Sequence, residues 1–146
     1  MTSPRNPKAD GPGKSSAAHS RDGQPVRVLV VDDHVLARST TRRQLREVPN
    51  LEVVGEAADG FEAVALARTL SPDLVFMDIC MPGLDGIEAT RRILAESPGI
   101  RIIMLSSHEE AYFQQCAASV GAAGYVVKGS GIRDLAAAVK RACASR

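Results

Sequence analysis

The chain has 146 residues, enough for one domain with a single buried core. A formal net charge of +1 argues against dominant electrostatic binding to nucleic acid, and 3% aromatic residues predict an aliphatic core. Three cysteines without metal-binding spacing favour reduced thiols over a disulfide framework. The sequence shows no signal-peptide h-region and no apolar run of bilayer-spanning length, so we expect a cytoplasmic location without membrane contact.

The beginning of the chain differs in composition from the rest. Residues 1–25 hold four of the eight prolines and no Val, Ile, Leu or Phe. Such a segment cannot bury enough apolar surface to offset its ordering entropy. We therefore predict a disordered tail over 1–25 and one folded domain over 26–146.

Strand-like apolar runs recur along that domain. The strongest cover 26–31, 73–77 and 100–105, and weaker ones cover 52–56 and 124–127. Near-continuous β-branched runs are typical of strands buried on both faces of a parallel sheet.

Helical spacing fills the gaps between these runs. Apolar residues recur at i, i+3, i+4 and i+7 within 63–70, 113–120 and 132–139, and less cleanly within 34–47 and 86–96. The strand–helix order therefore repeats five times. It predicts an α/β fold, a doubly wound five-stranded parallel sheet with helices on both faces.

Polar residues stand where the expected strands end. Asp32 and Asp33 follow the first strand, Asp78 the third, Ser106 closes the fourth, and Lys128 follows the fifth. Ligands of open parallel sheets bind beyond the carboxyl ends of the strands. We therefore expect three carboxylates, one hydroxyl and one ammonium to converge there.

This set of groups has a definite chemistry. Clustered carboxylates repel one another and need a cation, and Mg²⁺ prefers one or two carboxylates together with phosphate oxygens. A carboxylate can act as a nucleophile and form an aspartyl phosphate, while Lys and Ser contact phosphate oxygens. The set can thus provide a nucleophile, a metal site and two donors to a phosphoryl group.

Four motifs in this order resemble the receiver domains of bacterial two-component response regulators, over about residues 26–143. They are Val-Leu-Val-Val-Asp-Asp-His (28–34), Phe-Met-Asp-Ile-Cys-Met-Pro-Gly-Leu-Asp-Gly (76–86), Met-Leu-Ser-Ser-His (104–108) and Gly-Ala-Ala-Gly-Tyr-Val-Val-Lys (121–128). Asp-Asp-His and Lys128-Gly129 are most similar to the NarL/LuxR-type branch. The resemblance implies the (βα)5 flavodoxin-like receiver fold and a role in phosphorelay signal transduction.

The resemblance also implies roles for single residues. Asp78 would accept a phosphoryl group from the phosphohistidine of a sensor histidine kinase, and Lys128 would contact that group. Asp33, Asp78 and the backbone carbonyl of Cys80 would bind Mg²⁺, with Asp32 acting through water.

Further implied roles concern the switch and its lifetime. Ser106 would move toward the phosphoryl group, and Tyr125 would change rotamer with it. Cys80 and His108 occupy the two positions that tune self-dephosphorylation in the family. His34 is interpreted as a helix-start or packing residue, not as a site.

The sequence argues against three other functions. A small-molecule phosphatase or phosphotransferase that forms an aspartyl phosphate would carry a second Asp two residues after the nucleophile, where this chain has Cys80. A receiver that works by binding alone conflicts with the complete residue set. An FMN-binding protein would need a hydroxyl-rich phosphate loop after the first strand and more aromatic residues.

The expected partners are a sensor histidine kinase and either a downstream protein or a C-terminal output domain missing from this chain. We expect no direct contact with nucleic acid, because there is no second helical unit and no concentrated basic face. A homodimer formed on phosphorylation is left open. The expected activities are self-phosphorylation and self-dephosphorylation only, so the chain is predicted to be a signalling module and not an enzyme.

Overall fold

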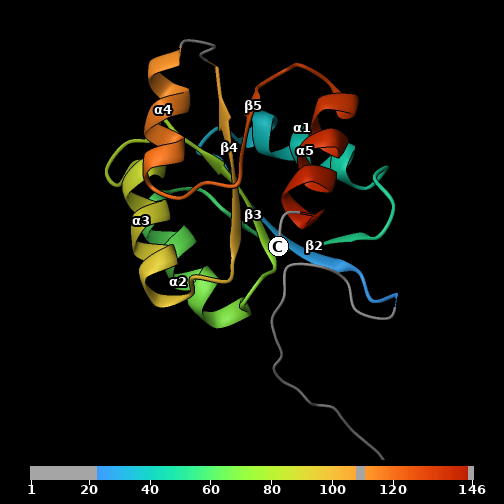
Figure 1. Ribbon diagram of the computed structural model, residues 1–146, viewed down its shortest axis with the longest axis horizontal. Helices are drawn as coiled ribbons and strands as arrows, with labels where there is room; N and C mark the ends of the chain where they lie inside the picture. The colour runs from blue at the N-terminus through green and yellow to red at the C-terminus, as the bar shows by residue number, and fades with distance from the viewer. Residues whose placement is uncertain (1–22, 108–110, 145–146) are drawn as a thin grey trace, which may run out of the picture.

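The computed structural model describes residues 23–107 and 111–144, in which strands and helices alternate (Figure 1). The strands are β1 (Val26–Val31), β2 (Leu51–Ala57), β3 (Leu74–Asp78), β4 (Arg101–Ser106) and β5 (Gly124–Val127). The helices are α1 (Val35–Leu45), α2 (Gly60–Leu70), α3 (Gly86–Glu96), α4 (Ala111–Ser119) and α5 (Ile132–Ala144). Each element expected from the sequence is present. Residues 1–22 of the predicted tail lie outside the described residues.

The five strands form one parallel sheet in the order β2-β1-β3-β4-β5. The chain first builds outward from β1 to β2 and then crosses back to add β3, β4 and β5. The direction of winding therefore reverses between β1 and β3, which is the point where ligands of such sheets bind. The predicted doubly wound α/β fold is confirmed.

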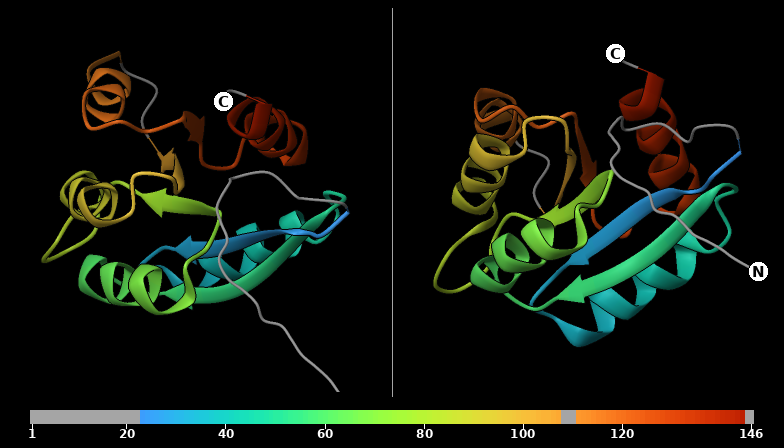
Figure 2. Two further views of the ribbon diagram at one scale, coloured as in Figure 1. Left: turned by 60° about the horizontal axis from the view of Figure 1, so that its bottom comes forward. Right: turned by 90° about the horizontal axis from the view of Figure 1, so that it is seen from below.

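The helices cover both faces of the sheet (Figure 2). Val75 and Met77 of β3 pack in one apolar cluster with residues of α2, α3 and α4, whereas Leu74 and Phe76 pack in the other with residues of α1 and α5. Successive side chains of a strand point to opposite faces, so a strand buried on both sides reads as a continuous apolar run. None of the helices in the described ranges is long and apolar enough to cross a membrane.

A glycine sets the distance between α3 and the end of β3. A Cβ atom at Gly86 would lie 2.1 Å from the backbone oxygen of Asp78, closer than any side chain allows. The Gly86 amide donates a hydrogen bond of 2.8 Å to the Ile79 carbonyl. Only glycine lets the helix begin this close to Asp78.

Candidate functional site

The polar residues predicted to converge do meet at the carboxyl ends of β1, β3, β4 and β5. Asp32, Asp78 and Ser106 are buried, with exposed fractions of 0%, 3% and 1%. Lys128 Nζ lies 2.9 Å from Asp32 Oδ2 and 3.2 Å from Asp78 Oδ2. The Lys128 amide donates to the Ser106 carbonyl at 2.7 Å, which ties the end of β5 to the end of β4.

Negative charge exceeds positive charge within this cluster. Asp32, Asp33 and Asp78 are carboxylates, and within the described residues Lys128 is the one ammonium that pairs with two of them. Burial, together with the charge of Asp32 and contact with the Asp33 carboxyl, raises the pKa of Asp78 to about 7, although Lys128 acts in the opposite direction. The ionised form of Asp78 is thus held at a cost that an added cation would relieve.

Lys128 remains charged in spite of its partial burial. Burial lowers the pKa of its ammonium, but hydrogen bonding and charge from Asp32 and Asp78 outweigh that effect and raise the pKa. A positive charge therefore lies directly beside Asp78, where it can bind an oxygen of an anion that enters the pocket.

His34 adds an imidazole to the rim of the pocket. Its backbone amide donates to Asp32 Oδ1 at 2.9 Å, and it is the N-cap of α1. The interpretation of His34 as a helix-start residue is therefore confirmed. Its Nδ1, however, also lies 3.3 Å from Asp33 Oδ1 and 3.6 Å from Asp32 Oδ1. The sequence interpretation missed this contact.

Arg38 is a second residue that sequence reasoning missed. Its Nη1 donates to the backbone oxygen of Asp32 at 2.8 Å, and its Nε donates to Glu56 Oε1 at 2.9 Å. The guanidinium thereby connects α1, the end of β1 and strand β2. Glu56 lies 18 residues away in the chain, so no local spacing signals this link.

The residues present fit a divalent cation. One ligand atom each from Asp32, Asp33, His34 and Asp78 lies within 4.8 Å of the others. Asp33 Oδ1 is buried, and no hydrogen bond from the described part of the chain reaches it. Hard carboxylate oxygens of this kind suit Mg²⁺.

The loop between β3 and α3 carries Cys80. Its thiol is exposed. Partial burial and the charge of Asp78 raise the pKa of this thiol, so it is protonated at neutral pH and a poor nucleophile. His108, the other residue predicted to tune the phosphoryl lifetime, lies outside the described residues.

Tyr125 lies in β5, three residues before Lys128. It is half-buried and packs against the apolar cluster on the side of α2, α3 and α4. A hollow of about 530 Å³ is lined by Tyr125, Lys128 and residues of α5 that include Asp134 and Arg141. The predicted readout residue and the site lysine therefore border one surface depression.

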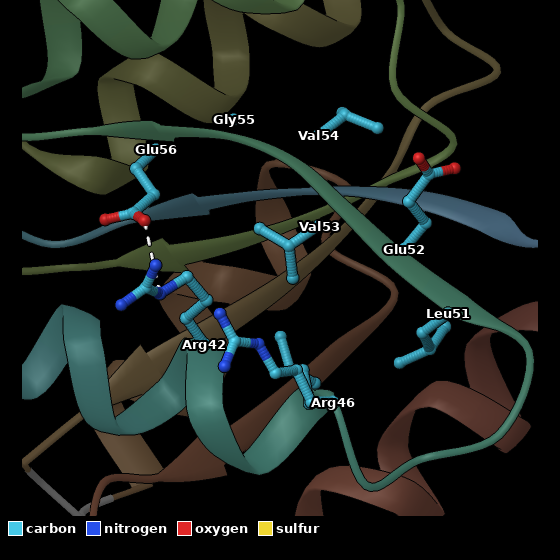
Figure 3. Close-up of a pocket in the computed structure, with 9 residues that line it drawn as sticks. Arg42, Arg46, Leu51, Glu52, Val53, Val54, Gly55 and Glu56 are labelled. Carbon is cyan, nitrogen blue, oxygen red and sulfur yellow. Dashed lines mark ion pairs between the residues drawn. The ribbon is translucent and has the colours of Figure 1, made fainter.

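A second hollow lies on the far edge of the sheet (Figure 3). It has a volume of about 520 Å³ and lies between the end of α1 and strand β2. Arg42 Nε pairs with Glu56 Oε2 at 3.3 Å on its wall (Figure 3). None of the clustered carboxylates lines this hollow.

Comparison with known proteins decides the family. The family model described as "Response regulator receiver domain" matches residues 28–140. The chain belongs to this family. It is 41% identical to response regulator GacA of Pseudomonas aeruginosa over 121 residues, which are 83% of this chain and 56% of GacA. The receiver domain spans about half the length of the curated relatives it matches.

Solved structures agree with the fold. A LuxR-family two-component response regulator from Aurantimonas has a TM-score of 0.80 at 40% identity, covering 84% of this chain and 88% of that one. The signal receiver domain of the putative response regulator NarL from Mycobacterium tuberculosis has a TM-score of 0.79 at 34% identity. This match covers 84% of this chain and 99% of the NarL domain. The resemblance to NarL/LuxR-type receivers is therefore confirmed. The receiver is a signalling module, and the small-molecule phosphatase or phosphotransferase is not favoured.

Proposed function

We propose that Asp78 is the phosphoacceptor of this receiver domain. One observation carries the proposal: a buried carboxylate at the end of β3 lies 3.2 Å from a lysine ammonium, inside a cluster with surplus negative charge. A carboxylate oxygen of Asp78 attacks the phosphorus atom of a phosphohistidine on a sensor histidine kinase. The P–N bond breaks, its electron pair stays on the leaving imidazole, and an aspartyl phosphate remains.

Asp33, Asp78 and the backbone carbonyl of Cys80 would hold Mg²⁺, with Asp32 contributing through water. The buried Asp33 Oδ1, which no described hydrogen bond satisfies, supports this assignment. Mg²⁺, when bound, would neutralise charge on the phosphoryl oxygens. Lys128 Nζ, already between Asp32 and Asp78, provides a second positive charge for those oxygens.

Ser106 and Tyr125 are proposed to report the modification. Ser106 is buried at the end of β4, next to β5 in the sheet, and its hydroxyl would donate to a phosphoryl oxygen. Tyr125 would change rotamer with that movement and remodel the surface beside α4 and α5. The new charge on Asp78 would thus bias a two-state element.

Release of the signal is proposed to use water. Water attacks the phosphorus atom, the bond to the Asp78 oxygen breaks, and phosphate leaves. Cys80 and His108 would set the rate by controlling the space open to that water. The downstream protein partner or output domain, a homodimer formed on phosphorylation and the cytoplasmic location stay predictions.

Incubation of the full chain with acetyl phosphate and Mg²⁺ tests the proposal. The intact protein should gain the mass of one phosphoryl group, and hydroxylamine should remove it because acyl phosphates react with that nucleophile. Asp78→Asn should gain nothing. Equal uptake by the Asn variant would contradict the assignment, and Asp85→Asn, which changes a helix-capping aspartate outside the pocket, is the matched control.

A further inference from the structure

The imidazole of His34 is placed as a metal ligand would be. Its Nδ1 lies 3.3 Å from Asp33 Oδ1. Two ligand atoms at about 2.0–2.2 Å from one ion, in tetrahedral or octahedral arrangement, lie roughly 3.0–3.5 Å apart. The separation between His34 Nδ1 and Asp33 Oδ1 lies within that range.

The exposure of His34 leaves room for such an ion. Its side chain is 72% exposed, whereas that of Asp33 is 21% exposed and that of Asp32 is fully buried. Core packing therefore does not hold the ring. The backbone contact with Asp32 and the start of α1 place it over the carboxylates.

This donor set differs from one made only of oxygen atoms. Mg²⁺ favours oxygen ligands, whereas imidazole nitrogen suits Zn²⁺, Ni²⁺ and related ions. A nitrogen ligand beside Asp33 should raise affinity for these borderline ions and leave affinity for Mg²⁺ almost unchanged. His34 would then decide which cations the pocket accepts.

We propose that His34 Nδ1, together with Asp33 and Asp78, forms a site for a divalent transition ion of the Zn²⁺ class that competes with Mg²⁺ for the same carboxylates. The proposal shares two carboxylates with the proposed phosphoacceptor site. It is tested by binding alone, without a phosphodonor, so the failure of one proposal is distinguishable from the failure of the other.

The test is a Zn²⁺ titration of the untagged, metal-free full chain against a colorimetric chelator. Mg²⁺ is titrated in parallel by calorimetry. His34→Ala should weaken Zn²⁺ binding roughly tenfold or more, because a direct ligand is lost, and should change Mg²⁺ binding by less than about twofold. Added Mg²⁺ should displace Zn²⁺ from the wild-type chain.

Three variants make the result specific. The His34 side chain makes no capping hydrogen bond to α1, whereas Asn is a favourable N-cap residue. His34→Asn should show the same selective loss, and this guards against misfolding of the alanine variant. His108→Ala and Cys80→Ser each remove another side chain with a nitrogen or sulfur ligand atom, and both variants should retain Zn²⁺ affinity. Loss of Zn²⁺ binding in either of these two with retention in His34→Ala would overturn the proposal.

The ring itself provides a direct readout. The ¹⁵N chemical shifts of the His34 imidazole should move to metal-bound values with Zn²⁺ and stay in place with Mg²⁺. An unshifted ring would overturn the proposal. Equal weakening of Zn²⁺ and Mg²⁺ in His34→Ala would overturn it too, because the imidazole would then act only by orienting Asp33.

Discussion

Two regions of the molecule each pair a carboxylate with a cationic side chain, but the pKa of the carboxylate shifts in opposite directions in the two. On the surface, Arg68 of α2 pairs with Glu96 of α3 through contacts of 3.0 and 2.7 Å. Each partner favours the charged form of the other, so the pKa of Glu96 is lowered and that of Arg68 is raised. In the pocket, Asp78 also has a cationic partner, yet its pKa is raised.

Burial and surplus charge explain the difference. The surface pair has one charge of each sign and both side chains are more than half exposed. Among the residues that the structure describes, the pocket has three carboxylates for one ammonium, and Asp32 and Asp78 are buried away from water. An ion pair alone therefore does not mark a reactive carboxylate. The better indicator of a reactive carboxylate is burial with too little positive charge nearby.

The largest effect should follow removal of the pocket cation. Lys128→Ala leaves Asp32 and Asp78 buried without their ammonium, so the free energy of unfolding in EDTA should fall by roughly 2 to 3 kcal/mol. Mg²⁺ should restore part of this loss by binding only the folded chain. Urea denaturation measures both effects, with exposed Lys140→Ala as the control. A loss equal to that of Lys140→Ala would contradict the description of the pocket.

The stability of the protein should depend nearly as strongly on the close approach of α3 to the end of β3. Gly86→Ala places a Cβ atom against the Asp78 backbone oxygen, so stability should fall by roughly 2 kcal/mol through displacement of α3. A Cβ atom at Gly99 would meet no heavy atom within 4 Å, so Gly99→Ala should leave the urea midpoint almost unchanged. Similar midpoints for the two variants would show that α3 is not fixed by this contact.

Neutralising Asp78 should stabilise the metal-free protein at high pH. A carboxyl group whose folded pKa is raised contributes stability below its unfolded pKa, and that stability is lost as pH rises through the folded value. For Asp78 the loss occurs between about pH 4 and about pH 7. The free energy of unfolding of Asp78→Asn should therefore exceed that of the wild type at about pH 8, and the difference should vanish near about pH 4. A constant difference across pH would refute the raised pKa.

The surface pair should give the smallest effect. Arg68→Ala removes an exposed ion pair whose attraction is screened by water and salt, so the unfolding midpoint should hardly move. Any small change at low salt should disappear in high salt. A shift comparable to that of Lys128→Ala would mean that exposure does not distinguish the two regions.

Much of the fold and of the site could be predicted from local patterns. Buried strands such as β3 (Leu74–Asp78) are nearly continuous apolar runs, and a polar residue closes or directly follows β1, β3, β4 and β5. The sheet then brings those ends together, which is why Asp32, Asp78, Ser106 and Lys128 could be grouped in advance.

The remaining features depend on contacts between distant elements. Val35 and Leu36 of α1 are exposed, so the apolar stripe of this helix was indistinct in the sequence. Arg38 is positioned by Glu56 of the neighbouring strand, and the His34 ring is positioned by carboxylates that only the fold brings close. No periodicity encodes these placements, because they arise from tertiary neighbours.

The central claim is that Asp78 is the phosphorylated residue. Borohydride reduction of the acetyl phosphate-treated chain converts an aspartyl phosphate to homoserine, which peptide mass spectrometry can locate. We predict homoserine at position 78 and aspartate at positions 32 and 33. Homoserine at 32 or 33 with an unmodified Asp78 would contradict the account.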